Sequence, residues 1–232
     1  MEIASVIAKA KADRRPALDE LAGKNLLASF GVSVPRSVIA KDANSAAGAV
    51  AGLKPPLALK IMSPDILHKS DAGGVKIGLK SGAEVAQAIE TMAALPAIKS
   101  ARVEGFLVEE MAPAGQEIVV GAVRDPDFGP MVMVGLGGIF VEVLADVAFR
   151  ICPITKLDAE EMLDELKGAA ILKGARGRKA VSREAIVDVL LKVGGENGLL
   201  LKHADDFKEA DINPLIVSET AAVAVDARFV LA

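Results

Sequence analysis

Tryptophan and tyrosine are absent from this 232-residue sequence, which has 7 phenylalanines, one cysteine and two histidines. The chain therefore lacks the aromatic platforms of single-strand binders. Its 27 basic and 31 acidic side chains also give no broad positive field for a phosphate backbone. The single cysteine, Cys152, excludes an internal disulfide and is typical of a reducing compartment. We expect a cytoplasmic protein with no nucleic-acid partner.

A long uninterrupted hydrophobic run is also missing. The most apolar stretch, residues 130–151, contains Glu142, Asp146 and Arg150, and each of these charges is unfavourable in hydrocarbon. Glu2, and further charges soon after it, interrupt the start that a secretory signal would need. We expect neither export by that route nor a membrane partner. The 52% of hydrophobic residues should instead form a sizeable buried core.

Neither common phosphate-binding glycine motif is present. No glycine is followed at the required spacing by Gly-Lys-Ser or Gly-Lys-Thr. The glycine run at Gly135, Gly137 and Gly138 has Phe140 where a dinucleotide fingerprint needs its third glycine. A nucleotide site in this chain must therefore use other residues.

The order of predicted elements indicates a mixed α and β fold of the α+β class, without the regular alternation of a doubly wound sheet. Adjacent strands with short connections favour antiparallel pairing. We predict two lobes, approximately residues 1–105 and 106–232, within one domain. Helices are predicted at 16–30, 44–53, 81–95, 158–168 and 183–193, and Ser81 with Glu84 three residues later predicts a capping box at the start of the third. Strands are predicted at 33–40, 57–62, 75–79, 106–111, 117–124, 131–134, 140–144, 212–217 and 221–226.

Two neighbouring features of the first lobe could bind phosphate. Lys60 lies inside an otherwise apolar strand, where a buried ammonium needs an anion, unless it is an edge-strand lysine that points to water. The following loop contains Gly73 and Gly74, whose backbone could approach an anion, although a plain hairpin connection would explain them equally. His68 in this loop could accept a phosphoryl group as a neutral imidazole, or could simply face solvent. The other histidine, His203, is expected at the surface.

Carboxylates mark a candidate nucleoside site. Glu109, Glu110 and Met111 end a strand that could offer its backbone to a nucleobase, with Glu109 and Glu117 available for the ribose hydroxyls. Ordinary exposed glutamates remain the alternative.

A metal site and a basic loop are predicted in the second lobe. Asn213 and Asp226 lie on two successive predicted strands, and a few oxygen ligands of this kind suit Mg²⁺. A turn-forming Asn-Pro and a strand-end aspartate would be the structural alternative. Arg176 lies in a basic glycine loop that could clamp a phosphate or be merely solvated.

Five strings, taken in order along nearly the whole chain, resemble the ATP-grasp β subunit of ADP-forming acetyl-CoA synthetases. They are HKSDAGGV at 68–75, RDPDFGP at 124–130, GLGGIFVE at 135–142, GARG at 174–177 and DINP at 211–214. The resemblance implies an ATP-grasp fold that holds ATP or ADP and Mg²⁺ between two lobes. It also implies a ligase that needs a CoA-binding α subunit or domain as partner.

The resemblance further implies a relay of phosphoryl groups. An acyl phosphate made on the partner phosphorylates a partner histidine, the group passes to His68, and ADP receives it. Lys60 would contact the phosphates, Gly73 and Gly74 would form the closing loop, and Asn213 with Asp226 would hold magnesium. Glu109 and Glu117 would bind the nucleoside, with the backbone at Glu110 and Met111 beside it. Arg176 would be a phosphate contact.

Two other functions remain open at this stage. One is a free-standing ATP-grasp carboxylate ligase in which ATP phosphorylates the acid directly and His68 is incidental. The other is a non-catalytic nucleotide-sensing module of a larger protein such as an acyltransferase. A phosphohistidine at His68 would distinguish the relay from both.

Overall fold

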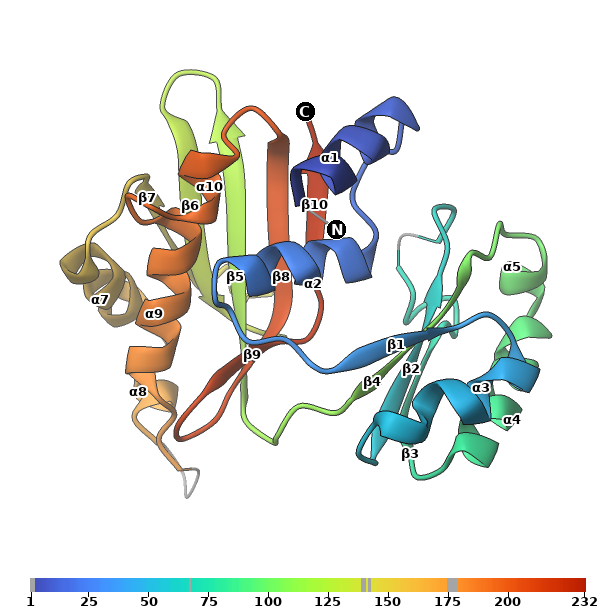
Figure 1. Cartoon of the computed structure of the whole chain (residues 1–232). Coiled ribbons are helices and arrows are strands. Elements are labelled where there is room, and N and C mark those ends of the chain that lie inside the picture. The colour runs from blue at the N-terminus through green and yellow to red at the C-terminus, as the bar shows by residue number, and fades with distance from the viewer. Residues whose placement is uncertain (1–2, 67, 139–140, 142, 175–178) are drawn as a thin grey trace. The chain divides into compact units, whose positions relative to one another are not determined.

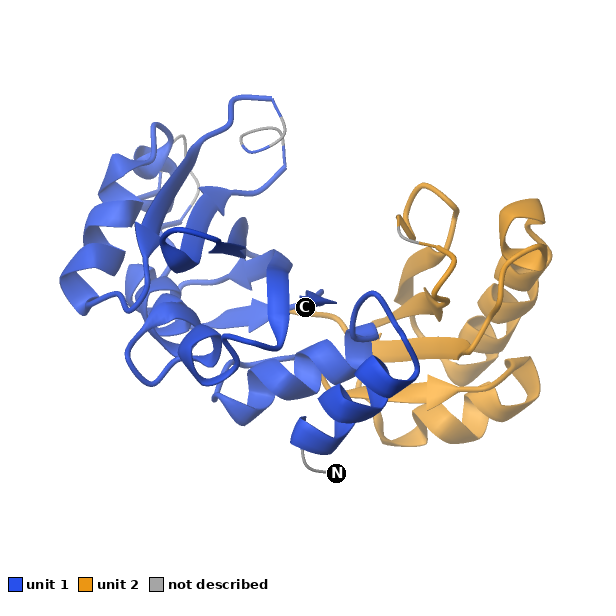
Figure 2. Cartoon of the chain, turned by 90° about the horizontal axis from the view of Figure 1, so that it is seen from above, with its two compact units in different colours: residues 1–34, 113–232 blue, residues 35–112 orange. Residues whose placement is uncertain are grey.

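The computed structural model describes residues 3–66, 68–138, 141, 143–174 and 179–232 (Figure 1). The chain divides into two compact units. Residues Pro35–Ala112 form unit 2, and unit 1 consists of Met1–Val34 together with Pro113–Ala232 (Figure 2). The division differs from the single boundary predicted near residue 105, because the first 34 residues belong with the C-terminal part of the chain.

Unit 2 is a four-stranded antiparallel sheet with helices on one face (Figure 1). Its strand order is β1-β4-β2-β3, which places β2 in the interior of the sheet. The strands are β1 (Ser37–Ala40), β2 (Leu57–Met62), β3 (Val75–Leu79) and β4 (Gly105–Glu110). The helical elements are α3 (Ala43–Ala49), η1 (Val50–Gly52), α4 (Gly82–Ala93) and α5 (Pro96–Lys99).

Local capping chemistry explains where the helices of unit 2 begin. Ser81 caps α4 by accepting a hydrogen bond from the amide of Glu84 at 3.2 Å, as the sequence predicts. The Glu84 carboxylate accepts from the amide of Lys80 at 2.9 Å, one residue before the position expected for a capping box. The helices bury an aliphatic cluster against β2 that includes Leu57, Leu59 and Ile61. Alternate residues of β2 therefore point to the opposite face.

Unit 1 is built on a larger antiparallel sheet with the order β10-β8-β5-β6-β7, in which β9 also pairs with β8. Its strands are β5 (Gln116–Asp125), β6 (Gly129–Leu136), β7 (Val147–Ile151), β8 (Phe207–Val217), β9 (Ala222–Ala224) and β10 (Arg228–Leu231). Its helices include α1 (Ile3–Ala12), α2 (Glu20–Ser29), α7 (Lys156–Glu165), α8 (Ala169–Leu172), α9 (Arg183–Gly194) and α10 (Leu199–Lys202).

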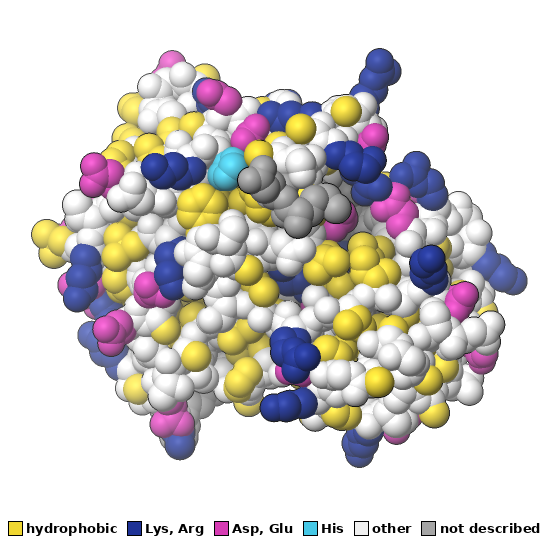
Figure 3. Space-filling view, viewed as in Figure 1, with side chains coloured by type: hydrophobic (Ala, Val, Ile, Leu, Met, Phe, Trp, Pro, Cys, Tyr) yellow, Lys and Arg dark blue, Asp and Glu magenta, His cyan; other side chains and the backbone are white. Residues whose placement is uncertain are grey.

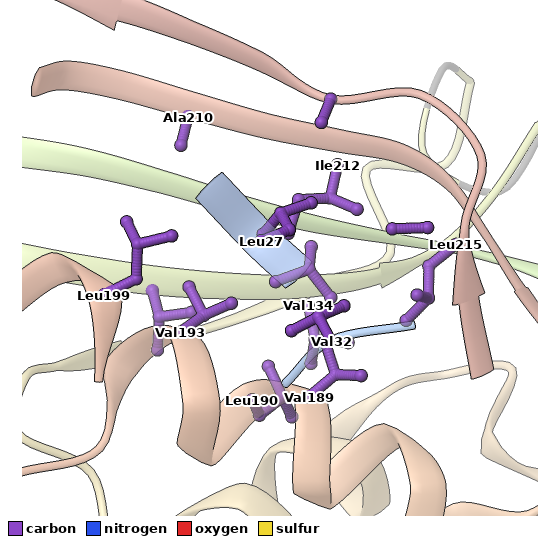
Figure 4. Packing of buried hydrophobic residues seen from close by; sticks show 14 of the residues in the cluster. Leu27, Val32, Val134, Val189, Leu190, Val193, Leu199, Ala210, Ile212 and Leu215 are labelled. Atoms are coloured by element: carbon purple, nitrogen blue, oxygen red, sulfur yellow. The ribbon is translucent and has the colours of Figure 1, made fainter. Parts of the chain in front are cut away.

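The core of unit 1 lies between this sheet and the helices on one of its faces. Leu27 of α2 and Leu190 of α9 pack with Val134 of β6 and Ile212 of β8 (Figure 4). These side chains are 0 to 1% exposed. The helix face of the sheet is therefore filled, and the odd-numbered residues of β5 and β6 point to the other face.

Helix α2 explains why the first residues belong to unit 1. The amide of Leu18, just before α2, donates to the carbonyl of Phe229 in β10 at 2.9 Å. A Cβ atom on Gly23 would lie 2.9 Å from the carbonyl oxygen of Ala227. The sequence prediction identified this helix but could not place it, because its contacts lie about 200 residues away in the chain.

Two local predictions were wrong. A strand is expected at 140–144, but residues 141, 143 and 144, which the structure describes, do not form one. The strand in this part of the chain is β7 (Val147–Ile151). The buried Asp146 carboxylate accepts from the amides of Lys167 and Gly168 at 2.7 and 2.8 Å, which fixes the chain just before β7. Helix α7 begins at an earlier cap than expected, because Thr155 is the N-cap and Asp158 completes its capping box.

None of the helices in the described ranges is long and apolar enough to cross a membrane. On the face seen in Figure 3, lysine and arginine side chains are interspersed with aspartate and glutamate. The absence of a nucleic-acid partner stays a prediction.

Glycine substitutions test the close approach of two strand ends in unit 1. A Cβ atom on Gly115 would lie 2.3 Å from the carbonyl oxygen of Val217, so Gly115→Ala should lower the free energy of unfolding by about 1–3 kcal/mol. Gly48 in α3 has no atom within 4 Å of its ideal Cβ, so Gly48→Ala should raise the same free energy by about 0.5–1 kcal/mol. Urea unfolding of both variants measures the difference, and equal effects would contradict this packing.

Candidate functional site

A buried ion pair lies at the centre of the sheet of unit 2. Lys60 of β2 and Glu109 of β4 are diagonal neighbours, because Lys60 is paired with Leu107 and Ala58 with Glu109. The Lys60 Nζ atom lies 2.7 Å from Oε1 of Glu109, and the two residues are 5% and 1% exposed. Lys60 is therefore not an edge-strand lysine that points to water, and Glu109 is not an exposed glutamate.

The pair lies on the sheet face opposite the helices of unit 2. Its neighbours Leu59 and Ile61 point into the hydrophobic cluster, so Lys60 between them points away from it. Two opposite charges that are buried together can remain ionised, whereas either one alone would carry a desolvation penalty of several kcal/mol. The unit thus presents a fixed ammonium group in a largely dehydrated setting.

His68 lies in the loop that joins β2 to β3 and is exposed. The loop leaves the same strand that carries Lys60, and Lys60 is paired directly with Val75, the first residue of β3. An exposed imidazole on this loop is accessible to a phosphoryl donor. Its role stays a prediction.

The glycines of this loop form its turn. The amide of Gly74 donates to the carbonyl of Lys69 at 2.7 Å, and the amide of Gly73 donates to Ser70 at 3.1 Å. Gly73 has a φ of +72°, and a Cβ atom on Gly74 would lie 2.5 Å from Cγ2 of Ile61. Both amides are thus engaged within the loop in this conformation. Glycine is needed here for the turn itself, and a contact of either residue with phosphate stays a prediction.

Glu110 and Met111 are held by the segments that precede β1 and β2. The Glu110 carboxylate accepts from the amide of Lys54 at 2.9 Å and lies 3.6 Å from Arg36. The amides of Glu110 and Met111 donate to the carbonyls of Arg36 and Pro56 at 3.0 and 3.1 Å. Both amides therefore already have acceptors in this conformation, so a nucleobase would have to contact other atoms of these residues.

Unit 1 brings the predicted metal-binding residues together. The backbone amide of Asn213 in β8 donates to the carbonyl of Asp226 at 3.3 Å, and the backbone amide of Val225 donates to the carbonyl of Pro214 at 3.0 Å. The chain therefore carries Asp226 alongside Asn213, although 13 positions separate them in sequence numbering. Glu117 is exposed on β5, the strand that pairs with β8.

Asp211 is a neighbour of this pair that the candidate residues from the sequence did not include. Its pKa is raised above the usual range, mainly because neighbouring atoms remove part of the water around the carboxyl group, although the residue as a whole is exposed. The negative charge of Asp226 raises the pKa further, while Arg228 opposes the shift. Asp211 and Asn213 are two residues apart on β8, so their side chains point to the same face of the sheet. This spacing is the sequence signal that could have identified Asp211 as a neighbour of the metal-binding residues. Electrostatic repulsion between two aspartates is relieved when a cation binds.

These residues fit a magnesium ion. Carboxylate and amide oxygens are its preferred protein ligands, and Mg²⁺ usually keeps several waters and substrate phosphates in its coordination shell. Within the described ranges there is no group of three or more His, Cys, Asp or Glu side chains arranged to hold a metal. A site of Asn213 and Asp226 with few protein ligands agrees with that preference.

Two other residues discussed from the sequence have different outcomes. Arg176 lies outside the described residues, and the neighbouring Lys179 forms an exposed ion pair with Glu219 at 2.6 Å. Cys152 is buried, and burial raises the pKa of its thiol to about 12, as expected for a structural cysteine.

The expectation for His203 was wrong. Its side chain is only 17% exposed, and its Nδ1 atom lies 2.9 Å from Asp206. Its ring centroid lies 5.9 Å from those of both Phe30, which is distant in the sequence, and Phe207, which is four residues away, so two aromatic rings cover it.

Substitutions at the Lys60–Glu109 pair should separate stability from nucleotide binding. Lys60→Met should lower the free energy of unfolding by about 3–5 kcal/mol, because it leaves the Glu109 carboxylate buried without this counter-charge. The double variant Lys60→Met/Glu109→Leu should recover most of that loss but should still bind ADP weakly. Chemical unfolding and calorimetric titration with ADP measure the two quantities. Normal ADP affinity in the double variant would contradict a phosphate-binding role for Lys60.

Comparison with known proteins identifies the family. The ATP-grasp domain family matches residues 9–231. The chain is 46% identical to the acetate–CoA ligase (ADP-forming) I subunit beta of Pyrococcus furiosus, over 97% of this chain and 96% of that one. It is also 41% identical to the acetate–CoA ligase (ADP-forming) I of Archaeoglobus fulgidus, over 90% of this chain but only 30% of that longer protein.

Solved structures agree with the sequence comparison. The acetyl-coenzyme A synthetase 1 of Ca. Korarchaeum cryptofilum, in complex with coenzyme A and Ca-AMPCP, matches with a TM-score of 0.92 and 39% identity over 100% of both chains. A Pyrococcus horikoshii protein matches with a TM-score of 0.91 and 39% identity over 100% of this chain and 98% of that one. The chain has the ATP-grasp fold and belongs to the family of ATP-grasp β subunits of ADP-forming acetate–CoA ligases.

Proposed function

We propose that this chain is the nucleotide-binding β subunit of an ADP-forming acyl-CoA synthetase and relays a phosphoryl group through His68 to ADP. The observation that carries the proposal is an exposed histidine on the loop that leaves the strand of the buried Lys60. A relative in the same family has been solved with Mg-AMPPCP and with a phosphohistidine segment pointing towards the nucleotide binding site. The two units would together form one ATP-grasp domain.

The relay consists of two displacements at phosphorus. In the first, a neutral nitrogen of the His68 imidazole attacks the phosphoryl group on a histidine of the partner, so that one P–N bond forms as another breaks. In the second, a terminal phosphate oxygen of ADP attacks phosphorus on His68, a P–O bond forms, and the P–N bond to His68 breaks. The imidazole returns to its neutral state and ATP is released. Positioning and charge neutralisation account for most of the catalysis in such transfers.

Residues of both units have roles in this scheme. Lys60 would neutralise the nucleotide phosphates, and Glu109 would hold its ammonium in place before they arrive. Asn213 and Asp226 would hold Mg²⁺, which when bound neutralises charge on the phosphate oxygens. Glu117 would bind the ribose, Glu110 and Met111 would border the nucleobase, and Arg176 would add a phosphate contact. Gly73 and Gly74 would allow the His68 loop to change conformation.

The acyl and CoA chemistry would lie on a separate partner. The chain spans 96% of the Pyrococcus relative, which is itself named a subunit beta, and 30% of the longer Archaeoglobus relative. The name of the Pyrococcus relative supports a hetero-oligomer in which a CoA-binding α subunit or domain is the partner. A single buried cysteine supports a cytoplasmic location.

The relay predicts a phosphohistidine. His68→Ala in the complex with the α subunit should lower acyl-CoA-dependent ATP synthesis on the order of 10³-fold, because the acceptor nitrogen is lost. ADP affinity should stay within about 2-fold of the parent. Mass spectrometry under alkaline conditions should locate an acid-labile phosphate on His68.

The second histidine provides the control. His203→Gln should keep both the phosphate on His68 and ATP synthesis at a temperature where the variant is folded, because His203 lies in a separate aromatic cluster. Full ATP synthesis by His68→Ala would exclude the relay and favour direct phosphorylation of the acid by ATP.

A further inference from the structure

Asp226 lies in the short connection between β9 and β10, so its position depends on what holds that connection. Its own backbone carbonyl accepts from Asn213 at 3.3 Å, and its carboxylate accepts from the amide of Ala227 at 2.8 Å. Residues on both sides of Asp226 are fixed by the N-terminal part of the chain. The amide of Ala224 donates to Ser33 at 2.8 Å, and the carbonyl of Phe229 accepts from Leu18 at 2.9 Å.

Helix α2 contacts the connection itself. Gly23 lies so close to it that a Cβ atom would be 2.9 Å from the carbonyl oxygen of Ala227. The next residue, Lys24, is 1% exposed, and its Nζ atom lies 3.4 Å from the carbonyl oxygen of Val225. The residues immediately before and after Asp226 are therefore both in contact with neighbouring positions of α2.

The Lys24 ammonium is also held by Glu20 on the same helix. Nζ lies 3.0 Å from Oε1 of Glu20, which is 7% exposed. Residues four apart on a helix face the same side, so Glu20 directs the lysine toward Val225. The proposed relay does not use either side chain.

Stability alone does not require a buried ion pair here. Apolar residues of similar volume often stabilise a fold as well as a buried pair or better, because no charge has to be dehydrated. They cannot, however, donate a hydrogen bond to the Val225 carbonyl. The distinctive contribution of Lys24 is therefore the orientation of the peptide that leads into Asp226.

We propose that Glu20 and Lys24 are positioning residues for magnesium binding, which act by fixing the Val225–Asp226 peptide and with it the Asp226 carboxylate. Magnesium requires near-ideal octahedral geometry, so a small displacement of one ligand weakens binding. Groups that orient metal ligands typically change metal affinity 10- to 100-fold when they are removed. The inference rests on the proposed metal site of Asn213 and Asp226.

Lys24→Met tests this role in the complex with the α subunit. The Mg²⁺ concentration that gives half-maximal ADP binding, measured by calorimetry below the unfolding temperature of each variant, should rise about 10-fold. Binding of ADP without Mg²⁺ should not change. The KM for Mg-ADP should rise more than kcat falls.

Lys192→Met is the matched control. Lys192 also pairs with a carboxylate four residues away, Asp188 at 2.6 Å, and donates to a backbone carbonyl, Gly31 at 2.8 Å. That carbonyl lies outside the segment that carries Asp226, so the Mg²⁺ requirement of Lys192→Met should equal that of the parent. An unchanged Mg²⁺ requirement in Lys24→Met would overturn the proposal, whatever the change in stability.

A second variant covers failure of Lys24→Met to fold. Glu20→Gln keeps the shape of the side chain but removes the charge that directs Lys24, and it should raise the Mg²⁺ requirement about 3-fold. An unchanged requirement would again overturn the proposal. If the parent complex itself shows no Mg²⁺-dependent ADP binding, the proposed function fails, and that result is distinct from failure of the positioning role.

Discussion

A lysine ammonium can be buried among aliphatic side chains only if a carboxylate accompanies it, and this constraint shapes both units. In unit 2 the pair is formed across strands by Lys60 and Glu109. In unit 1 it is formed along a helix by Glu20 and Lys24. Each pair lies beside residues proposed for nucleotide or metal binding, whereas the buried Asp146 carboxylate of unit 1 is bonded to backbone amides before β7.

The two pairs place different demands on the fold. The cross-strand pair requires the register between β2 and β4, because a slip of one residue would move Lys60 to the helix face. The pair of Glu20 and Lys24 depends only on the helical turn of α2, which places residues four apart on the same side. The contact of Lys24 with Val225 depends in addition on the packing of α2 next to β10. Register in one unit and helix docking in the other therefore determine where the charges lie.

Local features were predictable from the sequence. The apolar pattern around Lys60 located β2, and Ser81 with Glu84 located the start of α4. The resemblance of several short strings predicted the family and fold. Helix α1 and strand β10 were missed, because the helix has a narrow buried face at Ile7 and Ala10 and the strand is only four residues long.

Non-local features were not predictable in the same way. Nothing in the local sequence indicates that Glu109 reaches Lys60, that Asp211 is influenced by Asp226, or that Phe30 covers His203. Each contact depends on strand register or on helix packing, which is fixed only in the complete fold. For the same reason, the sequence did not reveal that residues 1–34 belong to the same unit as the C-terminal part of the chain.

That division has a consequence for biosynthesis. Unit 2 is continuous in sequence and can collapse as soon as its last strand leaves the ribosome, whereas unit 1 begins at the first residues and closes only with β10. The apolar face of helix α2 is therefore fully covered only after β10 has been translated. A nascent chain that is halted before β10 should expose this face to chaperones while the inserted unit is already folded.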